Sequence, residues 1–295
     1  MGSMVQSNSI GAAFSAAFGL EPVLVGALVA VMALLVFAGG VQRIAALTEK
    51  LVPLMALFYV GGALAVILAN AGCILPALRS IFVGAFAPQA LAGGVLGVTA
   101  KKAVRFGVAR GLFSNESGMG STPHAHAIAQ VDHPVQQGYV AMLGVFVDTF
   151  VVLTLTALVI LTTGVLPPDG SLQGTALTQA GFTAVFGPYG AVFIALCMFF
   201  FAFSSIVGWY FFGEINVRYL FGPRAVKPYC LLACCCIVLG AGLRVDLVWE
   251  MADACNGLMV VPNLLALLAL GGLAAALTRE YERQTARPLP RRRRH

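Results

Sequence analysis

Long apolar segments alternate with short polar ones along almost the whole chain. A helix needs about 20 mostly apolar residues to cross a bilayer, whereas the strands of a membrane barrel alternate apolar and polar positions over about ten residues. The apolar segments here are continuous and predict helices at residues 22–40, 51–70, 92–130, 135–163, 182–212, 229–243 and 251–277. We therefore expect an all-α integral membrane protein with about seven transmembrane helices.

The first residues of the chain predict a shorter element. Residues 4–18 lead directly into apolar positions, without the basic segment and hydrophobic core of a signal peptide. This pattern is typical of the second half of a helix. We expect an N-terminal stub that begins in the middle of an element.

Composition supports a membrane protein and distinguishes a basic C-terminal tail from the membrane domain. The 295 residues are 59% hydrophobic and 10% charged, and soluble domains are about 25% charged. The net charge of +6 comes partly from four arginines at residues 291–294. We interpret residues 1–278 as one transmembrane domain and residues 279–295 as a basic cytoplasmic tail near anionic lipid. No aromatic residues are interleaved with these arginines, so we expect no nucleic-acid partner.

Charge in the connections predicts the orientation. The short connections 42–50 and 213–228 are basic and are expected in the cytoplasm, whereas 164–178 has no Lys or Arg and is expected outside. This places the C-terminus on the cytoplasmic side of the cell inner membrane. Basic residues near the start of segment 92–130 do not fit, and we expect Arg105 and Arg110 to face the bundle interior, paired with Glu116 or Asp148.

Segment 92–130 cannot be an ordinary span. Its residues 107–123 read GVARGLFSNESGMGSTP, with four glycines, a proline and several polar side chains. Glycine and proline interrupt the helical hydrogen bonds, and freed backbone groups at membrane depth must be buried in protein or line a wet cavity. We expect a discontinuous helix around residues 98–130, as at transport sites. The alternative is a polar loop between two spans.

Such a break can hold a small zwitterion. Residues 118–122 are expected to start a new half-helix, whose free N–H groups, beginning at Gly118, favour a carboxylate. Carbonyl groups before the break, from Gly111 to Ser114, can hold an ammonium group or a sodium ion.

Two further features fit an ion-coupled carrier. A lone carboxylate inside a span, as at Asp148, is costly and is either an ion ligand or the partner of an arginine. Ser204 and Ser205 lie in a phenylalanine-rich run, where their hydroxyls either bond to the i−4 carbonyl or serve as hard ligands to a cation. No nucleotide-binding, catalytic serine or zinc-protease motif occurs, so we expect neither an enzyme nor a cofactor besides the coupling ion.

The interrupted segment resembles the alanine or glycine:cation symporter family. The resemblance is carried by the motif GVARGLFSNESGMGS at residues 107–121, by His133-Pro134, and by GVFVDT at residues 144–149. Residues 4–9 and 48–53, with Arg43-Ile44, are also similar to that family.

This resemblance implies a fold and a set of site residues. The fold is the leucine-transporter-like bundle of two inverted repeats of five helices, in which segment 92–130 is the sixth core helix. Gln6 then faces the substrate from the third helix, and Phe113, Ser114 and Asn115 line the same pocket. Ser204 and Ser205 match the hydroxyl pair that usually completes a sodium site.

The resemblance also implies that part of the bundle is missing. Such carriers use a pair of broken helices, one from each repeat, and this sequence has one. The first two core helices and part of the third should precede Met1, so we expect the C-terminal part of a symporter that does not transport alone. Its function would be sodium-coupled symport of a small neutral amino acid, alanine or glycine. The alternative is a non-transporting fragment or membrane scaffold.

Overall fold

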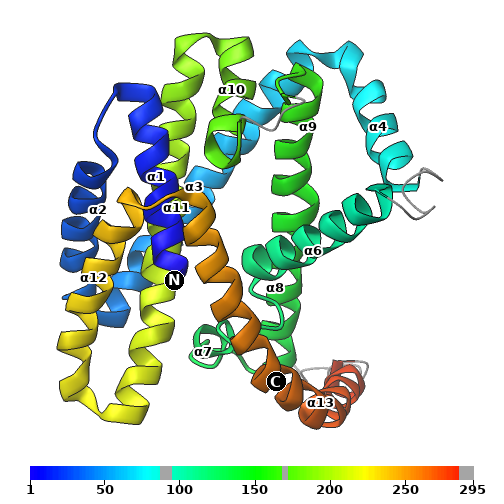
Figure 1. Cartoon of the computed structure of the whole chain (residues 1–295). Coiled ribbons are helices and arrows are strands. Elements are labelled where there is room, and N and C mark those ends of the chain that lie inside the picture. Colours follow the sequence, from blue (N-terminus) through cyan, green and yellow to red (C-terminus); the bar gives the residue numbers. More distant parts are fainter. Residues whose placement is uncertain (87–94, 168–171, 286–295) are drawn as a thin grey trace, which may run out of the picture.

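The computed structural model describes residues 1–86, 95–167 and 172–285, and the elements in these ranges are all helical (Figure 1). In chain order they are α1 (Gly2–Phe18), α2 (Pro22–Phe37), α3 (Gly40–Ala69), η1 (Ala71–Cys73), α4 (Ile74–Phe86), α6 (Val95–Asn115), α7 (Pro123–His126), α8 (Pro134–Phe146), the π-helix η2 (Val147–Leu153), α9 (Thr154–Thr163), α10 (Gly174–Phe186), α11 (Pro188–Phe221), η3 (Pro223–Ala225), α12 (Val226–Gly242) and α13 (Val245–Thr285).

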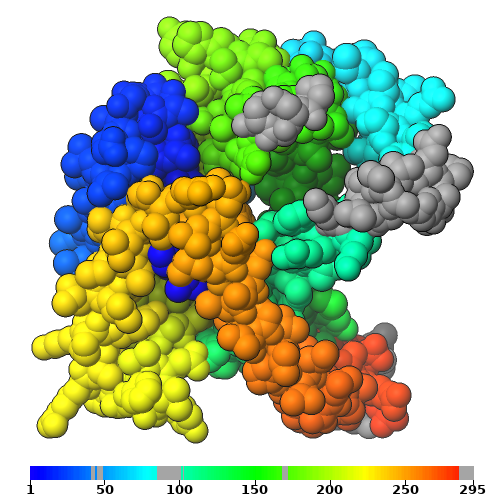
Figure 2. Space-filling model, viewed as in Figure 1, coloured from blue at the N-terminus to red at the C-terminus, as the bar shows by residue number. Residues whose placement is uncertain are grey.

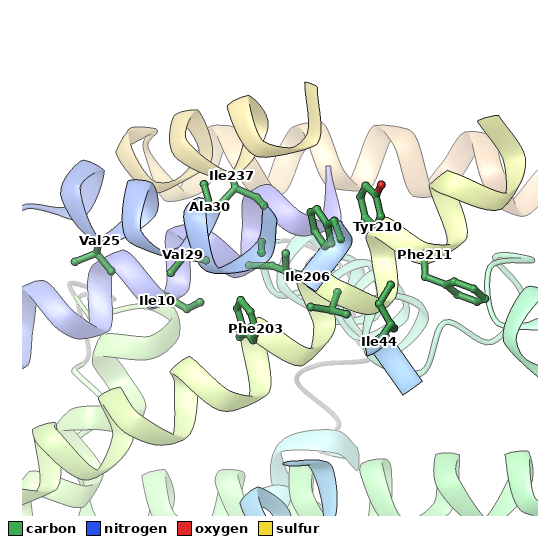
Figure 3. Close-up of a cluster of buried hydrophobic side chains, with 14 residues drawn as sticks. Ile10, Val25, Val29, Ala30, Ile44, Phe203, Ile206, Tyr210, Phe211 and Ile237 are labelled. Carbon is green, nitrogen blue, oxygen red and sulfur yellow. The ribbon is translucent and has the colours of Figure 1, made fainter. Parts of the chain in front are cut away.

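The short first helix α1 is the centre of the main core. It packs against α2, α11 and α12, and Ile10 on α1 is fully buried in this cluster (Figure 3). The Asn8 side chain donates hydrogen bonds to the carbonyls of Gly240 and Leu243, 2.9 and 2.8 Å away, at the end of α12. Burial and these two bonds fix α1 although it is only 17 residues long.

A second core joins α3, α9, α10 and α11. Phe182 of α10 is fully buried there, and Tyr59 of α3 shares a 2.5 Å hydrogen bond with Thr156 of α9. Figure 1 shows α9 and α4 on one side of the molecule, and α2 and α12 on the other. The long helices α3 and α11 contribute to both cores.

Several predicted boundaries are wrong. The connection predicted at residues 42–50 is helical, because α3 begins at Gly40 and continues through it to Ala69. The predicted span 182–212 is divided where Gly187 takes a φ of 59° directly before Pro188, which starts α11. The predicted connection 213–228 begins inside α11, which ends at Phe221.

Five helical segments of the described chain are long and apolar enough to cross a bilayer. They are Glu49–Ala69, Pro134–Thr163, Pro188–Phe221, Pro223–Gly242 and Val245–Thr285. Two shorter apolar helical segments, Pro22–Phe37 and Ala71–Gly84, fall below the length of a full span. The chain is therefore a multi-pass helical membrane protein, and the count of seven spans stays a prediction. The arginines at residues 291–294 lie outside the described residues.

The contact between α10 and α11 gives a first test of this packing. A Cβ added at Gly190 would lie 2.5 Å from backbone atoms of Phe182, whereas one added at Gly208 on the same helix meets nothing within 4 Å. We expect Gly190→Ala to lower the free energy of unfolding by about 1–3 kcal/mol through overpacking. Gly208→Ala should be neutral or stabilise α11 by up to about 1 kcal/mol. Thermal unfolding of the two purified variants in detergent measures this, and equal melting temperatures would argue against the contact.

Candidate functional site

The polypeptide leaves the helical conformation directly after Asn115. Glu116 has a φ of 51°, and Gly118 and Gly120 have φ values of 93° and 79°. Left-handed conformations of this kind end a helix, and glycine adopts them without steric cost. The interruption spans residues 116–122 between α6 and α7, inside the segment for which the sequence predicts a break.

The half-helix predicted to start at Gly118 is wrong in position and extent. The left-handed residues delay the next helix until Pro123, and α7 has only four residues. After a further irregular stretch, α8 begins at Pro134. A single turn adds few aligned peptide dipoles, so it offers a carboxylate much less than a full half-helix would.

The last residues of α6 pair with the π-helix η2. Ser114 Oγ donates a hydrogen bond of 2.6 Å to Asp148 Oδ2, and Thr149 Oγ1 donates one of 3.0 Å to Asn115 Oδ1. Asp148 and Thr149 lie on a π-helical segment, and such segments are frequently found at functional sites.

These four side chains, which we call the α6–η2 oxygen cluster, lie beside a pocket of about 610 Å³. Ser114, Asn115 and Asp148 line it, together with Ser117 and Thr122 of the interruption. Four side-chain oxygen groups with one carboxylate form a donor set that suits a hard cation. Thr149 is a member that the sequence did not single out. In the described residues, no group of three or more His, Cys, Asp or Glu side chains could hold a metal ion.

The Phe113 side chain faces a different set of residues. Its ring centroid lies 6.0 Å from that of Trp209 on α11 and 4.9 Å from that of Trp249 on α13. It also packs on the buried cluster that contains Met4 and Val5 of α1. Phe113 therefore connects α6 to α1, α11 and α13.

Gln6, Gly111 and Gly118 remain candidates for substrate contacts. Gln6 is half-buried on α1, directly after Val5, whose cluster includes Phe113. Gly111 lies in the last part of α6, where an added Cβ meets nothing within 4 Å. Gly118 lies in the interruption, where an added Cβ would be 3.6 Å from Leu112.

Ser204 and Ser205 bond to their own helix. Both hydroxyls donate to the carbonyl of Phe201, three and four residues earlier and each at 2.9 Å, and their role as ion ligands stays a prediction. Among the described residues, those that line the two pockets beside the interruption do not include either serine. The structure therefore does not bring this pair together with the α6–η2 oxygen cluster.

Arg110 has a different partner from the two predicted ones. Its guanidinium forms two hydrogen bonds of 2.9 Å with the carboxylate of Asp253 on α13, and it lies 3.8 Å from the ring centroid of Trp249. Glu116 instead accepts a 2.5 Å hydrogen bond from Ser121. Arg105 is exposed and lies near the ring of its neighbour Phe106. The pairings predicted with Glu116 and Asp148 are wrong because α13, distant in sequence, supplies the planar carboxylate that a guanidinium binds best.

The helix α13 contacts both the end of α6 and the interruption. On α6, Arg110 binds Asp253, and within the interruption a Cβ at Gly120 would lie 2.9 Å from Asn263 Oδ1. A second pocket, of about 630 Å³, lies on this side and is lined by Gly120, His124 and Asn263. Figure 2 shows α13, orange to red, across this face next to the green segments.

The ion pair of Arg110 and Asp253 should contribute measurably to the stability of the folded chain. Removing one member of such a charged, doubly hydrogen-bonded pair costs about 1.5–3 kcal/mol. We expect Arg110→Met to lower the melting temperature clearly, and a cycle with Asp253→Leu to show coupling between the two positions. Arg105→Met is the matched control, since Arg105 is exposed. Equal effects of the two arginine variants would contradict this assignment.

Polar and ionisable side chains that meet at a helix interruption inside a multi-pass protein are typical of secondary transporters. The family model for the sodium:alanine symporter family matches residues 1–292. The chain therefore belongs to this family of transporters, which confirms the resemblance.

Individual relatives agree with this assignment. The chain is 42% identical to an uncharacterized transporter of Haemophilus influenzae over 95% of its own length and 62% of that protein. It is 38% identical to the sodium/alanine symporter AgcS of Methanococcus maripaludis (95% and 61%) and 39% identical to the probable sodium/glutamine symporter GlnT of Bacillus subtilis (95% and 58%). The chain thus spans about three fifths of the length of these relatives.

Proposed function

We propose that this chain is the part of a secondary active transporter that binds sodium and a small neutral amino acid, alanine or glycine. The α6–η2 oxygen cluster is the single observation that supports this most strongly, because it places a carboxylate and three neutral oxygen groups beside the interruption. Transport, and not catalysis, is the activity of the complete protein. Relatives named for alanine and for glutamine are compatible with a small neutral solute.

The proposed ion site consists of Ser114, Asn115, Asp148 and Thr149. Carboxylate and neutral oxygens at the end of α6 and on η2 would neutralise and coordinate Na⁺. We assign the coupling ion to Asp148 in preference to Ser204 and Ser205, because neither serine lines a pocket beside the interruption. The amino acid would lie against the interruption, near Phe113 and Gly118.

The proposed mechanism uses the two pockets beside the interruption. Sodium and the amino acid bind together and stabilise one conformation around residues 116–122, and movement of a helix group then exposes the site to the other side of the membrane. Helices from each repeat of a leucine-transporter-like bundle would carry this movement. In this arrangement the chain lies in the cell inner membrane with its C-terminus in the cytoplasm.

Binding of radiolabelled alanine to the purified chain in detergent tests the proposal. We expect binding in NaCl and little in KCl, with competition by unlabelled glycine. Binding that is equal in the two salts would refute sodium coupling. No binding of any small neutral amino acid would instead favour the alternative of a non-transporting fragment or scaffold.

A further inference from the structure

An apolar groove lies between α2 and α12, which pack side by side on one side of the molecule (Figure 1). It has a volume of about 540 Å³ and shares no lining residue with the two pockets beside the interruption. The described residues that line it are apolar side chains and two cysteines: Ala27, Ala30, Val31 and Leu34 of α2, and four residues of α12 from Cys234 to Leu239. The groove therefore suits a hydrocarbon chain and offers nothing to a polar solute.

Small side chains make the groove hollow. Ala30 is buried, and the Cys234 thiol lies 3.8 Å from its carbonyl oxygen, so the two helices touch at the floor. Larger and exposed side chains, among them Leu34 and Leu239, stand along the edges. An empty hollow would forfeit dispersion contacts, and the solvent around a membrane-spanning helix such as α12 can fill it with an acyl chain.

The two helices run antiparallel along the groove. A Cβ added at Gly26 would lie 2.5 Å from Cβ of Ala241, whereas Ala30, four residues later on α2, meets Cys234, seven residues earlier on α12. One end of the groove therefore points to the start of α12, and the other end points to the start of α2.

These two ends differ in charge. Arg224 of η3 and Lys227 of α12 lie toward the first end, where both are exposed, and among the described residues neither forms a salt bridge. Toward the second end lie the exposed Glu21, next to the start of α2, and Arg244, whose guanidinium is 4.0 Å from the Asp246 carboxylate. A ligand with one anionic end and one apolar end therefore has a preferred direction in the groove.

Lys227 is also on the correct face and at the correct height. At 100° per residue, it lies within about 20° of Cys234 and of Val238 around α12. The groove residues from Cys234 to Leu239 are about 10–18 Å further along the helix, and half of the hydrocarbon core of a bilayer is about 15 Å. A lipid with its phosphate at Lys227 would have its acyl chain at the level of the groove.

Aromatic side chains beside this end fit the membrane interface. Tyr219 and Phe221, at the end of α11, are 87% and 72% exposed. Aromatic residues with an apolar body are enriched where the hydrocarbon core meets the headgroups. Basic residues at such a position bind anionic headgroups.

We propose that the α2–α12 groove is a binding site for an anionic phospholipid, with one acyl chain in the groove and the phosphate at Arg224 and Lys227. This inference is independent of the proposed sodium and amino-acid site. A zwitterionic lipid with the same acyl chains fills the same groove but gains less from the two basic residues.

Native mass spectrometry of the purified chain in detergent tests this site, with titration of dioleoylphosphatidylglycerol or dioleoylphosphatidylcholine. We expect the parent chain to bind phosphatidylglycerol more tightly. The double variant Arg224→Gln with Lys227→Gln should bind it about 25-fold more weakly, about fivefold for each charge removed. Its binding of phosphatidylcholine should change little.

Two pairs of variants separate the headgroup contact from the groove. Arg244→Gln removes one exposed positive charge at the other end and should leave the preference for phosphatidylglycerol intact. Cys235→Phe fills the groove from its exposed wall and should weaken the binding of both lipids. Leu232→Phe is its control, since Leu232 is exposed on α12 but does not line the groove.

Three results would overturn the site. The first is equal binding of the two lipids by the parent chain. The second is the same loss in Arg244→Gln as in Lys227→Gln, which would mean general attraction to a basic protein. The third is unchanged binding in Cys235→Phe, which would leave the groove to bulk lipid, detergent or another protein segment.

Discussion

Asp148→Asn should raise the sodium concentration required for half-maximal alanine binding by at least about 30-fold. Asparagine keeps the shape of the side chain and an acceptor for Ser114, whose hydrogen bond to Asp148 Oδ2 is 2.6 Å, but it removes the charge. Truncating one partner of a close charge interaction typically costs about 2 kcal/mol or more, which corresponds to this factor. Titration of radiolabelled alanine binding with NaCl measures the change.

Two controls make this result specific. Asp246→Asn removes an exposed carboxylate, 4.0 Å from Arg244, and should leave the titration unchanged. Ser204→Ala combined with Ser205→Ala should also have a small effect, since neither serine lines a pocket beside the interruption. A large shift in the double serine variant and none in Asp148→Asn would place the ion on α11 instead.

The second large effect is expected at Gly120. Its φ of 79° costs an L-residue about 1–2 kcal/mol, and a Cβ there would be 2.9 Å from Asn263 Oδ1, an overpacking that costs about 1–3 kcal/mol more. We expect Gly120→Ala to lower the melting temperature strongly and to abolish alanine binding, because it displaces the interruption from α13.

Two further variants separate the effect of backbone strain at Gly120 from that of its close contact with Asn263. Gly111→Ala lies in α6 with free space around the new Cβ, and it should be neutral or stabilising by up to about 1 kcal/mol. Gly120→Ala combined with Asn263→Ala removes the two closest contacts of the new Cβ, with Asn263 Oδ1 and Cγ, and keeps the backbone strain, so it should recover part of the stability. If Gly111→Ala and Gly120→Ala behave alike, the geometry of the interruption described above is wrong.

The all-helical class and the position of the interruption could be predicted from the sequence. Apolar length alone predicts most spans, because a bilayer demands about 20 apolar residues, and the glycines and proline of residues 107–123 mark where a helix cannot continue. Boundaries were less predictable. Charged residues such as Lys50 were interpreted as a connection, whereas α3 runs through them as one helix.

Contacts between distant elements could not be predicted from local pattern. Arg110 and Asp253 are 143 residues apart, and nothing near either residue in the sequence indicates the other. Thr149 was missed as a cluster member because its partner Asn115 is 34 residues away in the sequence, and nothing beside Thr149 indicates that contact.

The most direct test of the ion site is a structure of the chain with thallium(I), a heavier monovalent cation, in place of sodium and with alanine present. We predict an anomalous peak within the α6–η2 oxygen cluster, in contact with Asp148 and next to the interruption at residues 116–122. A peak at Ser204 and Ser205, with none at Asp148, would contradict this account.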